Sequence, residues 1–204
     1  MTLSDRLGLS DSQERLAVRL LQFALAGLVG YGLVTMRFAI AATGGFALAI
    51  TLLPAALRRE YGYSMDVGLV LWITVAMILH TVGSLWLYEW FQWYDEITHT
   101  VSATIIAGIG YASFRAFELH SDDIDVPPAF RAVFIVVFVL AAGVVWEVLE
   151  FALGGVVTVY GLDDIVTDFV FNAVGAVIMA VWGTGYVGGL VGFFRRRLRS
   201  DAEG

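Results

Sequence analysis

Long apolar runs constrain this chain more than any other feature of its sequence. A helix needs about 20 apolar residues to cross a bilayer core of about 30 Å. Charged residues make up only 15% of the chain, whereas a soluble domain is about a quarter charged. We therefore predict an all-α membrane protein, a six-transmembrane-helix bundle forming one domain. The expected spans are residues 16 to 35, 38 to 57, 67 to 88, 97 to 117, 132 to 153 and 165 to 190.

The arginines predict the orientation of this bundle. All twelve basic residues are arginines, and every one except Arg37 lies near a chain end, between the second and third spans, or beside the loop that joins the fourth span to the fifth. These positions fall on one side of a six-span protein. The positive-inside rule then places both termini in the cytoplasm of a multi-pass plasma-membrane protein. The aromatic run WLYEWFQWY falls at the outer interface, where tryptophan and tyrosine are enriched.

Polar side chains that are costly to bury gather at the outer end of three consecutive spans. Within each helix they recur at three- or four-residue spacing and so project from one side. Small residues on the same faces allow helices to approach closely. These polar residues are Asp95 and His99 in the fourth span, Glu147 and Glu150 in the fifth, and Asp164, Asp168 and Asn172 in the sixth.

The cost of these carboxylates indicates a bound cation or protonated acids. One carboxylate at the centre of a spanning helix costs about 2.5–3.5 kcal/mol even on the insertion scale. Basic partners at this end are scarce, since only Arg37 and His99 are available. A histidine beside oxygen ligands favours Zn, Mn or Fe(II), whereas an all-oxygen Ca or Mg site would leave His99 unused. The chain has no cysteine, so a thiolate site is excluded.

Simpler explanations remain open for several of these residues. Asp95 can be an N-cap of the fourth span, and Asp163 or Asp164 can cap the sixth, because aspartate is favoured there. The acids inside the helices can face a water-exposed groove. His80, in the middle of the third span, can be a buried histidine satisfied by hydrogen bonds or a residue that supports the site.

The motifs also resemble known membrane families. YDEITHTVSA, WEVLEF and DDIVTDFVFNAVGA together are similar to the uncharacterised YjdF-type membrane proteins, over roughly Tyr94 to Gly175. The order of acid, histidine, glutamate and a late DxxxNxxGA motif more loosely resembles VanZ-like membrane proteins. The chain departs from that second pattern at Glu150, where VanZ-like proteins tend to carry Gln, and it lacks their usual Arg in the outer loop before the last helix. The resemblance supports the set of polar residues and implies no established reaction.

We expect a metal-assisted enzyme that acts on a lipid or lipid-linked substrate from the outer side. A metal ion there activates water or polarises an ester or phosphoryl oxygen. Cation- or proton-coupled transport and a non-catalytic scaffold with a structural cation remain alternatives. The net charge of −7 argues against a nucleic-acid partner. The expected roles are ligands for Asp95, His99, Glu147 and Asp168, acid or base catalysis for Glu150, support for Asn172 and Asp164, and anion binding for Arg37.

Overall fold

The structure is a computed structural model of the 204-residue chain, and every regular element in its described part is helical. It describes residues 10 to 120, 123 to 124, 126 to 152, 154, 161 to 183 and 187 to 202. The all-α prediction is thus confirmed for these residues. The elements are α2 (Asp11–Val34), α3 (Phe38–Tyr61), α4 (Val67–Val82), η1 (Gly83–Leu87), α5 (Tyr88–Trp90), α6 (Gln92–Glu118), α7 (Pro128–Ala152), α8 (Leu162–Ile178), η2 (Met179–Gly183) and α9 (Gly188–Ala202).

Five helical stretches are long and apolar enough to cross a membrane, within the described residues. Helix α6 has 27 residues, about 40 Å at 1.5 Å per residue, but it is not among the five. Its length suffices, so its composition excludes it: Asp95, His99 and a series of threonines dilute its apolar residues. The five stretches are Asp11–Val34, Phe38–Tyr61, Val67–Trp90, Pro128–Ala152 and Leu162–Val181.

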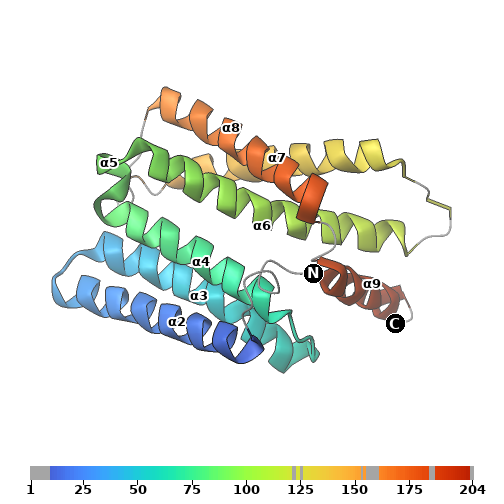
Figure 1. Cartoon of the computed structure of the whole chain (residues 1–204), viewed down its shortest axis with the longest axis horizontal. Helices are drawn as coiled ribbons and strands as arrows, with labels where there is room; N and C mark the ends of the chain where they lie inside the picture. Colours follow the sequence, from blue (N-terminus) through green and yellow to red (C-terminus); the bar gives the residue numbers. More distant parts are fainter. Residues whose placement is uncertain are drawn as a thin grey trace. The chain divides into compact units, whose positions relative to one another are not determined.

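The last expected span, residues 165 to 190, differs from the observed helices. Helix α8 begins at Leu162 and continues into η2, which ends at Gly183, and α9 starts as a separate helix at Gly188. Figure 1 draws α9 as a distinct helix. The sequence GTGYVGG spans this change, and glycine disfavours a continuous helix by about 1 kcal/mol per residue relative to alanine.

The N-terminal compact unit contains α2, α3, α4, η1, α5 and the first turns of α6. Helices α2, α3 and α4 pack against one another, as Figure 1 shows. The turn between α2 and α3 is tight because Gly32 has no side chain: a Cβ there would lie 2.6 Å from the backbone nitrogen of Ala41. The backbone N–H of Arg37 donates to the carbonyl of Gly32 at 2.8 Å, which closes this turn.

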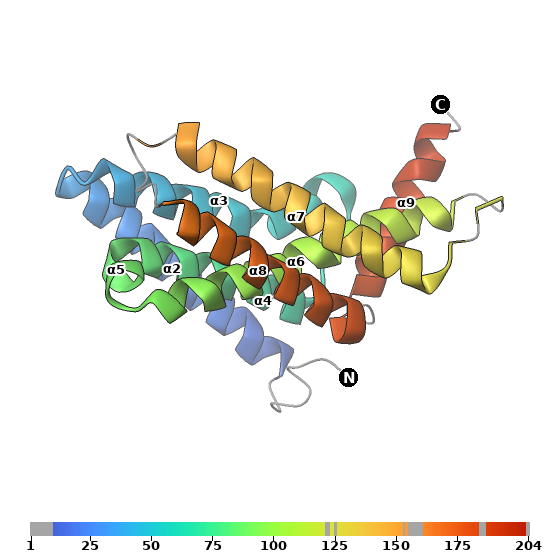
Figure 2. The same cartoon turned by 90° about the horizontal axis from the view of Figure 1, so that it is seen from above.

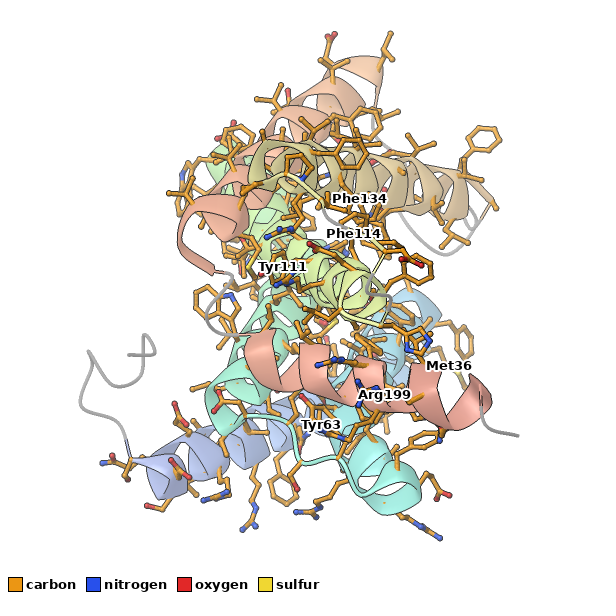
Figure 3. All side chains as sticks on the ribbon, turned by 90° about the vertical axis from the view of Figure 1, so that its right-hand side faces the viewer. Met36, Tyr63, Tyr111, Phe114, Phe134 and Arg199 are labelled. Carbon is orange, nitrogen blue, oxygen red and sulfur yellow. The ribbon has the colours of Figure 1, made fainter. Side chains whose placement is uncertain are left out.

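The second compact unit contains α6 from His99 onward, α7 up to Leu149, α8, η2 and α9. Helices α6, α7 and α8 run alongside one another in Figures 1 and 2. Phe114 of α6 stacks on Phe134 of α7 with ring centroids 4.3 Å apart, and Figure 3 shows these two rings side by side. Stacked aromatic pairs contribute about 0.5–1.5 kcal/mol beyond their buried area.

An ion-pair cluster joins the end of α6 to the start of α7. Glu118, only 5% exposed, accepts from Arg115 Nη1 at 2.7 Å and lies 3.2 Å from Arg131 Nε. Arg131 also donates to the carbonyl of Val126 at 2.9 Å. Burial alone would raise the pKa of Glu118, but the hydrogen bond and charge of Arg115 and the charge of Arg131 together hold that pKa below its ordinary value.

Many large apolar side chains on these helices are exposed. Phe23 of α2 is 75% exposed and Phe151 of α7 is 80% exposed. Exposed apolar area costs about 25 cal/mol per Å² in water, whereas a lipid environment removes that cost. The exposed faces therefore fit the membrane setting that the five apolar helices indicate.

Candidate metal site

Helix α6 carries the first two residues of the site. It begins at Gln92, so Asp95 lies inside its first turn and not at the N-cap position. His99 follows one helical turn later on the same face. Helix α8 likewise begins at Leu162 with Gly161 as its N-cap, and no side chain caps it. Capping therefore does not account for Asp95, Asp163 or Asp164.

A close crossing of α6 and α8 brings the third residue near. A Cβ on Gly175 of α8 would lie 2.5 Å from the carbonyl oxygen of Thr100, so only glycine permits this approach. The hydroxyl of Thr104 donates to the carbonyl of Gly175 at 3.3 Å, and that of Thr100 donates to the carbonyl of Phe171 at 3.4 Å. These hydroxyls donate across the contact between the two helices, as threonine hydroxyls commonly do between membrane helices.

The result is a buried pair between His99 and Asp168. His99 Nε2 lies 3.4 Å from Asp168 Oδ1, and the side chains are 12% and 6% exposed. Asn172, one turn after Asp168, forms a side-chain hydrogen bond with His99. Gly143 of α7 leaves room for this amide, because a Cβ there would lie 2.9 Å from Asn172 Nδ2. Three helices of the second unit thus define the position of the histidine ring.

Asp95, His99 and Asp168 together form a group that can hold a metal ion. Each offers one ligand atom, and these atoms all lie within 4.8 Å of one another. Two ligands that bind one ion at about 2.1 Å in tetrahedral geometry lie about 3.4 Å apart, which is the separation of His99 Nε2 and Asp168 Oδ1. Two ligands at about 2.1 Å from one ion lie at most about 4.2 Å apart, so any wider separation within this group would have to shorten for all three to bind one ion.

The other predicted residues lie around this group or away from it. Glu147 of α7 interacts electrostatically with Asp164 of α8, and both side chains are partly buried. Glu150 lies near the end of α7 and interacts with the phenol of Tyr88. Arg37 is exposed in the turn before α3. The predicted roles of these residues stay predictions: Glu147 as a ligand, Asp164 as a supporting residue, Glu150 as the acid or base, and Arg37 as an anion contact.

Tyr88 and Thr98 were not singled out by the sequence analysis. Tyr88 belongs to the aromatic run that was interpreted as an interfacial belt, yet its hydroxyl lies 2.8 Å from His80 Nδ1. A π-helical turn at Gly83–Leu87 lies between His80 and Tyr88, so regular helical spacing gave no signal for this pair. Thr98 is buried, and its hydroxyl donates to the carbonyl of Tyr94 at 2.8 Å.

Comparison with known proteins places the chain among membrane proteins. A family model described as "Predicted membrane protein (DUF2238)" matches residues 16–189, most of the chain. No curated protein and no solved structure is significantly similar to the chain. The resemblance to YjdF-type and VanZ-like proteins stays a prediction.

Proposed function

The chain belongs to this family of predicted membrane proteins, and on that premise we propose that Asp95, His99 and Asp168 bind a divalent transition-metal ion for chemistry on a membrane lipid. The substrate class is a lipid or lipid-linked molecule with an ester or phosphoryl group. Zn, Mn or Fe(II) suits a set of one histidine and two carboxylates.

The separation of 3.4 Å between His99 Nε2 and Asp168 Oδ1 carries this proposal. This distance is at the long end for a hydrogen bond, since nitrogen–oxygen hydrogen bonds in proteins are commonly 2.7–3.2 Å. The same distance suits two ligands of one ion. Asp168 is 4% exposed, and an effective penalty of several kcal/mol per buried ion requires compensation. Asp168 already interacts with its neighbours, and a cation between the two side chains adds to that compensation.

The remaining residues have complementary roles in this proposal. When bound, the metal lowers the pKa of a water molecule and polarises the scissile group. Asn172 orients the ring of His99, as hydrogen-bond partners of metal-binding histidines commonly do. Glu150 acts as general acid or base. Glu147 and Asp164 hold a further carboxylate pair nearby on α7 and α8, and Arg37 contacts an anionic headgroup.

The proposed setting is a plasma membrane crossed six times, with α6 as the fourth span and both termini in the cytoplasm. The arginine distribution supports this orientation, since it places the basic residues on one side. The site then faces outward, where α6 begins and α8 begins. Lipid substrates reach such a site laterally from the outer leaflet.

Metal content of the purified protein tests the first half of the proposal. We expect elemental analysis in detergent to find about one transition-metal ion per chain. His99→Gln and Asp168→Asn should each remove it. Asp163→Asn is the matched control, because Asp163 is an exposed acid on the first turn of α8 outside the group, and it should retain the metal. A wild-type protein without metal after incubation with Zn, Mn and Fe(II) would refute the site.

Turnover of lipids tests the second half. Metal-loaded protein in liposomes is incubated with phosphatidylglycerol, phosphatidylethanolamine and a polyprenyl diphosphate, and the products are measured by mass spectrometry. We expect one class to be converted, and Glu150→Gln to abolish conversion while metal content stays unchanged. Equal conversion by wild type and Glu150→Gln would exclude Glu150 as the acid or base. A metal-bound protein that converts none of these substrates would contradict the enzymatic role.

A further inference from the structure

Two tyrosine hydroxyls meet consecutive residues of α4 next to the site. The hydroxyl of Tyr88 lies 2.8 Å from His80 Nδ1, and the hydroxyl of Tyr94 donates to the carbonyl of Leu79 at 3.0 Å. The rings of Tyr88 and Tyr94 are 5.9 Å apart. We call Leu79, His80, Tyr88 and Tyr94 the tyrosine clamp. All four belong to the N-terminal unit.

A π-helical turn makes this arrangement possible. The turn η1 begins at Gly83, and a Cβ on Gly83 would overlap the ring of Tyr88. Glycine therefore leaves room for the Tyr88 ring to fold back toward His80, which it meets edge-on at 5.8 Å. π-Helical turns are rare and are often found at functional sites. The π-helical turn, Gly83 and the hydrogen bond to His80 thus together position the phenol of Tyr88.

The clamp acts on the turn of α6 that carries Asp95. Tyr94 directly precedes Asp95, and the carbonyl of Tyr94 accepts the hydroxyl of Thr98 at 2.8 Å. The ring of Tyr88 lies 5.9 Å from the ring of Tyr94, and the side chain of Tyr88 forms a hydrogen bond with Thr98. The first turn of a helix lacks intrahelical partners for its N–H groups and frays easily. Anchors on both sides of Asp95 hold this turn in place.

We propose that the tyrosine clamp positions Asp95 as a metal ligand, with Tyr88 as a positioning residue that His80 holds by a hydrogen bond. This inference rests on the proposed metal site. His99 and Asp168 are already fixed within the second unit by Asn172 and the crossing at Gly175. Asp95 lies in the first turn of its helix and needs separate support. Partners that orient a ligand typically change metal affinity by about 10–100-fold when removed.

Zinc affinity of the full-length protein in detergent tests the clamp. The Zn²⁺ dissociation constant is measured by competition with a fluorescent chelator, for wild type, Tyr88→Phe and Tyr31→Phe. Tyr88→Phe keeps the ring and removes only the hydroxyl, and we expect about tenfold weaker binding or more. Tyr31 of α2 is 49% exposed, so Tyr31→Phe should bind as wild type does.

Two further measurements separate positioning from folding. Co²⁺ replaces Zn²⁺, and its visible absorption reports the ligand geometry; we expect a changed spectrum in Tyr88→Phe. His80→Gln keeps a hydrogen-bond acceptor for the tyrosine and should retain most of the zinc affinity, whereas His80→Leu should lose it. If Tyr88→Phe fails to fold, the contrast between His80→Gln and His80→Leu decides the same question.

The outcomes distinguish the clamp from the metal site itself. A wild-type protein that binds neither Zn²⁺ nor Co²⁺ overturns both. A wild-type protein that binds Zn²⁺, with unchanged affinity and an unchanged Co²⁺ spectrum in Tyr88→Phe, overturns the clamp and leaves the metal site standing. Equal affinities for His80→Gln and His80→Leu also overturn the clamp.

Discussion

Replacing Gly175 with alanine should separate α6 from α8 and weaken the site between them. The added Cβ would lie 2.5 Å from the carbonyl oxygen of Thr100 and 2.7 Å from Cβ of Ala103. Ordinary contacts begin at 3.4 Å, so the two helices must move apart by about 0.9 Å. Backbone atoms provide the first of these contacts, and no flexible side-chain end can give way there.

The expected cost follows from a comparison with a second glycine. Gly45 of α3 has no heavy atom within 4 Å of a built Cβ, so Gly45→Ala is the matched control. Both substitutions gain about 1 kcal/mol of helix propensity. Only Gly175→Ala carries the steric cost, about 1–3 kcal/mol for overpacking. The difference in unfolding free energy between the two variants should therefore be about 1–3 kcal/mol.

Unfolding in mixed detergent micelles with rising SDS, followed by tryptophan fluorescence, measures this difference. Zinc affinity is measured on the same samples. Metal–ligand distances tolerate deviations of about 0.2 Å, so a separation of 0.9 Å near His99 and Asp168 should also weaken zinc binding. Equal stability of the two variants would refute the close crossing. Loss of stability with unchanged zinc affinity would refute the claim that the crossing positions the ligands.

Three further predictions concern the ends of the helices. Glu118→Gln removes a carboxylate whose pKa is lowered by Arg115 and Arg131, and it should cost about 1–3 kcal/mol at pH 7. Folding lowers the pKa of Glu118, so its carboxylate stabilises the fold above its unfolded pKa near 4.3. This stabilisation is lost as the pH falls through the folded pKa. The wild type should therefore lose more stability than the variant on acidification below about pH 4.5. A cysteine at Gln92 should react with an impermeant thiol reagent from outside intact cells, and labelling only after lysis would reverse the orientation. Gly32→Ala should destabilise the turn between α2 and α3 by about 1–3 kcal/mol relative to Gly45→Ala in the SDS titration, because its Cβ would lie 2.6 Å from a backbone nitrogen.

The apolar runs predicted the helical class and the approximate position of most helices, because a helix that crosses the bilayer core needs about 20 apolar residues. The glycine-rich stretch after residue 182 was read as part of a span because its residues are apolar, although α9 begins separately at Gly188. In helix α6, by contrast, polar residues occur within one continuous helix. Its threonines lower its hydropathy, yet their hydroxyls are satisfied by backbone carbonyls in the structure.

The candidate site was accessible from sequence because its acids and histidine recur at helical spacing. Asp95, His99 and Asp168 followed from that periodicity, and the candidate metal-binding group contains all three. The tyrosine clamp could not be found in this way. It depends on a π-helical turn at Gly83, which shifts the register of the following residues, and a regular helical period does not anticipate that shift. The packing of Asn172 beside Gly143 likewise depends on which helices become neighbours.

Anomalous diffraction from zinc-soaked crystals tests the central claim most directly. Data recorded above and below the zinc absorption edge reveal the ion independently of any assumed ligands. The account predicts one anomalous peak within about 2.0–2.2 Å of His99 Nε2 and of a carboxylate oxygen of both Asp95 and Asp168. A peak elsewhere, or no peak among these three side chains in a zinc-saturated crystal, would contradict it.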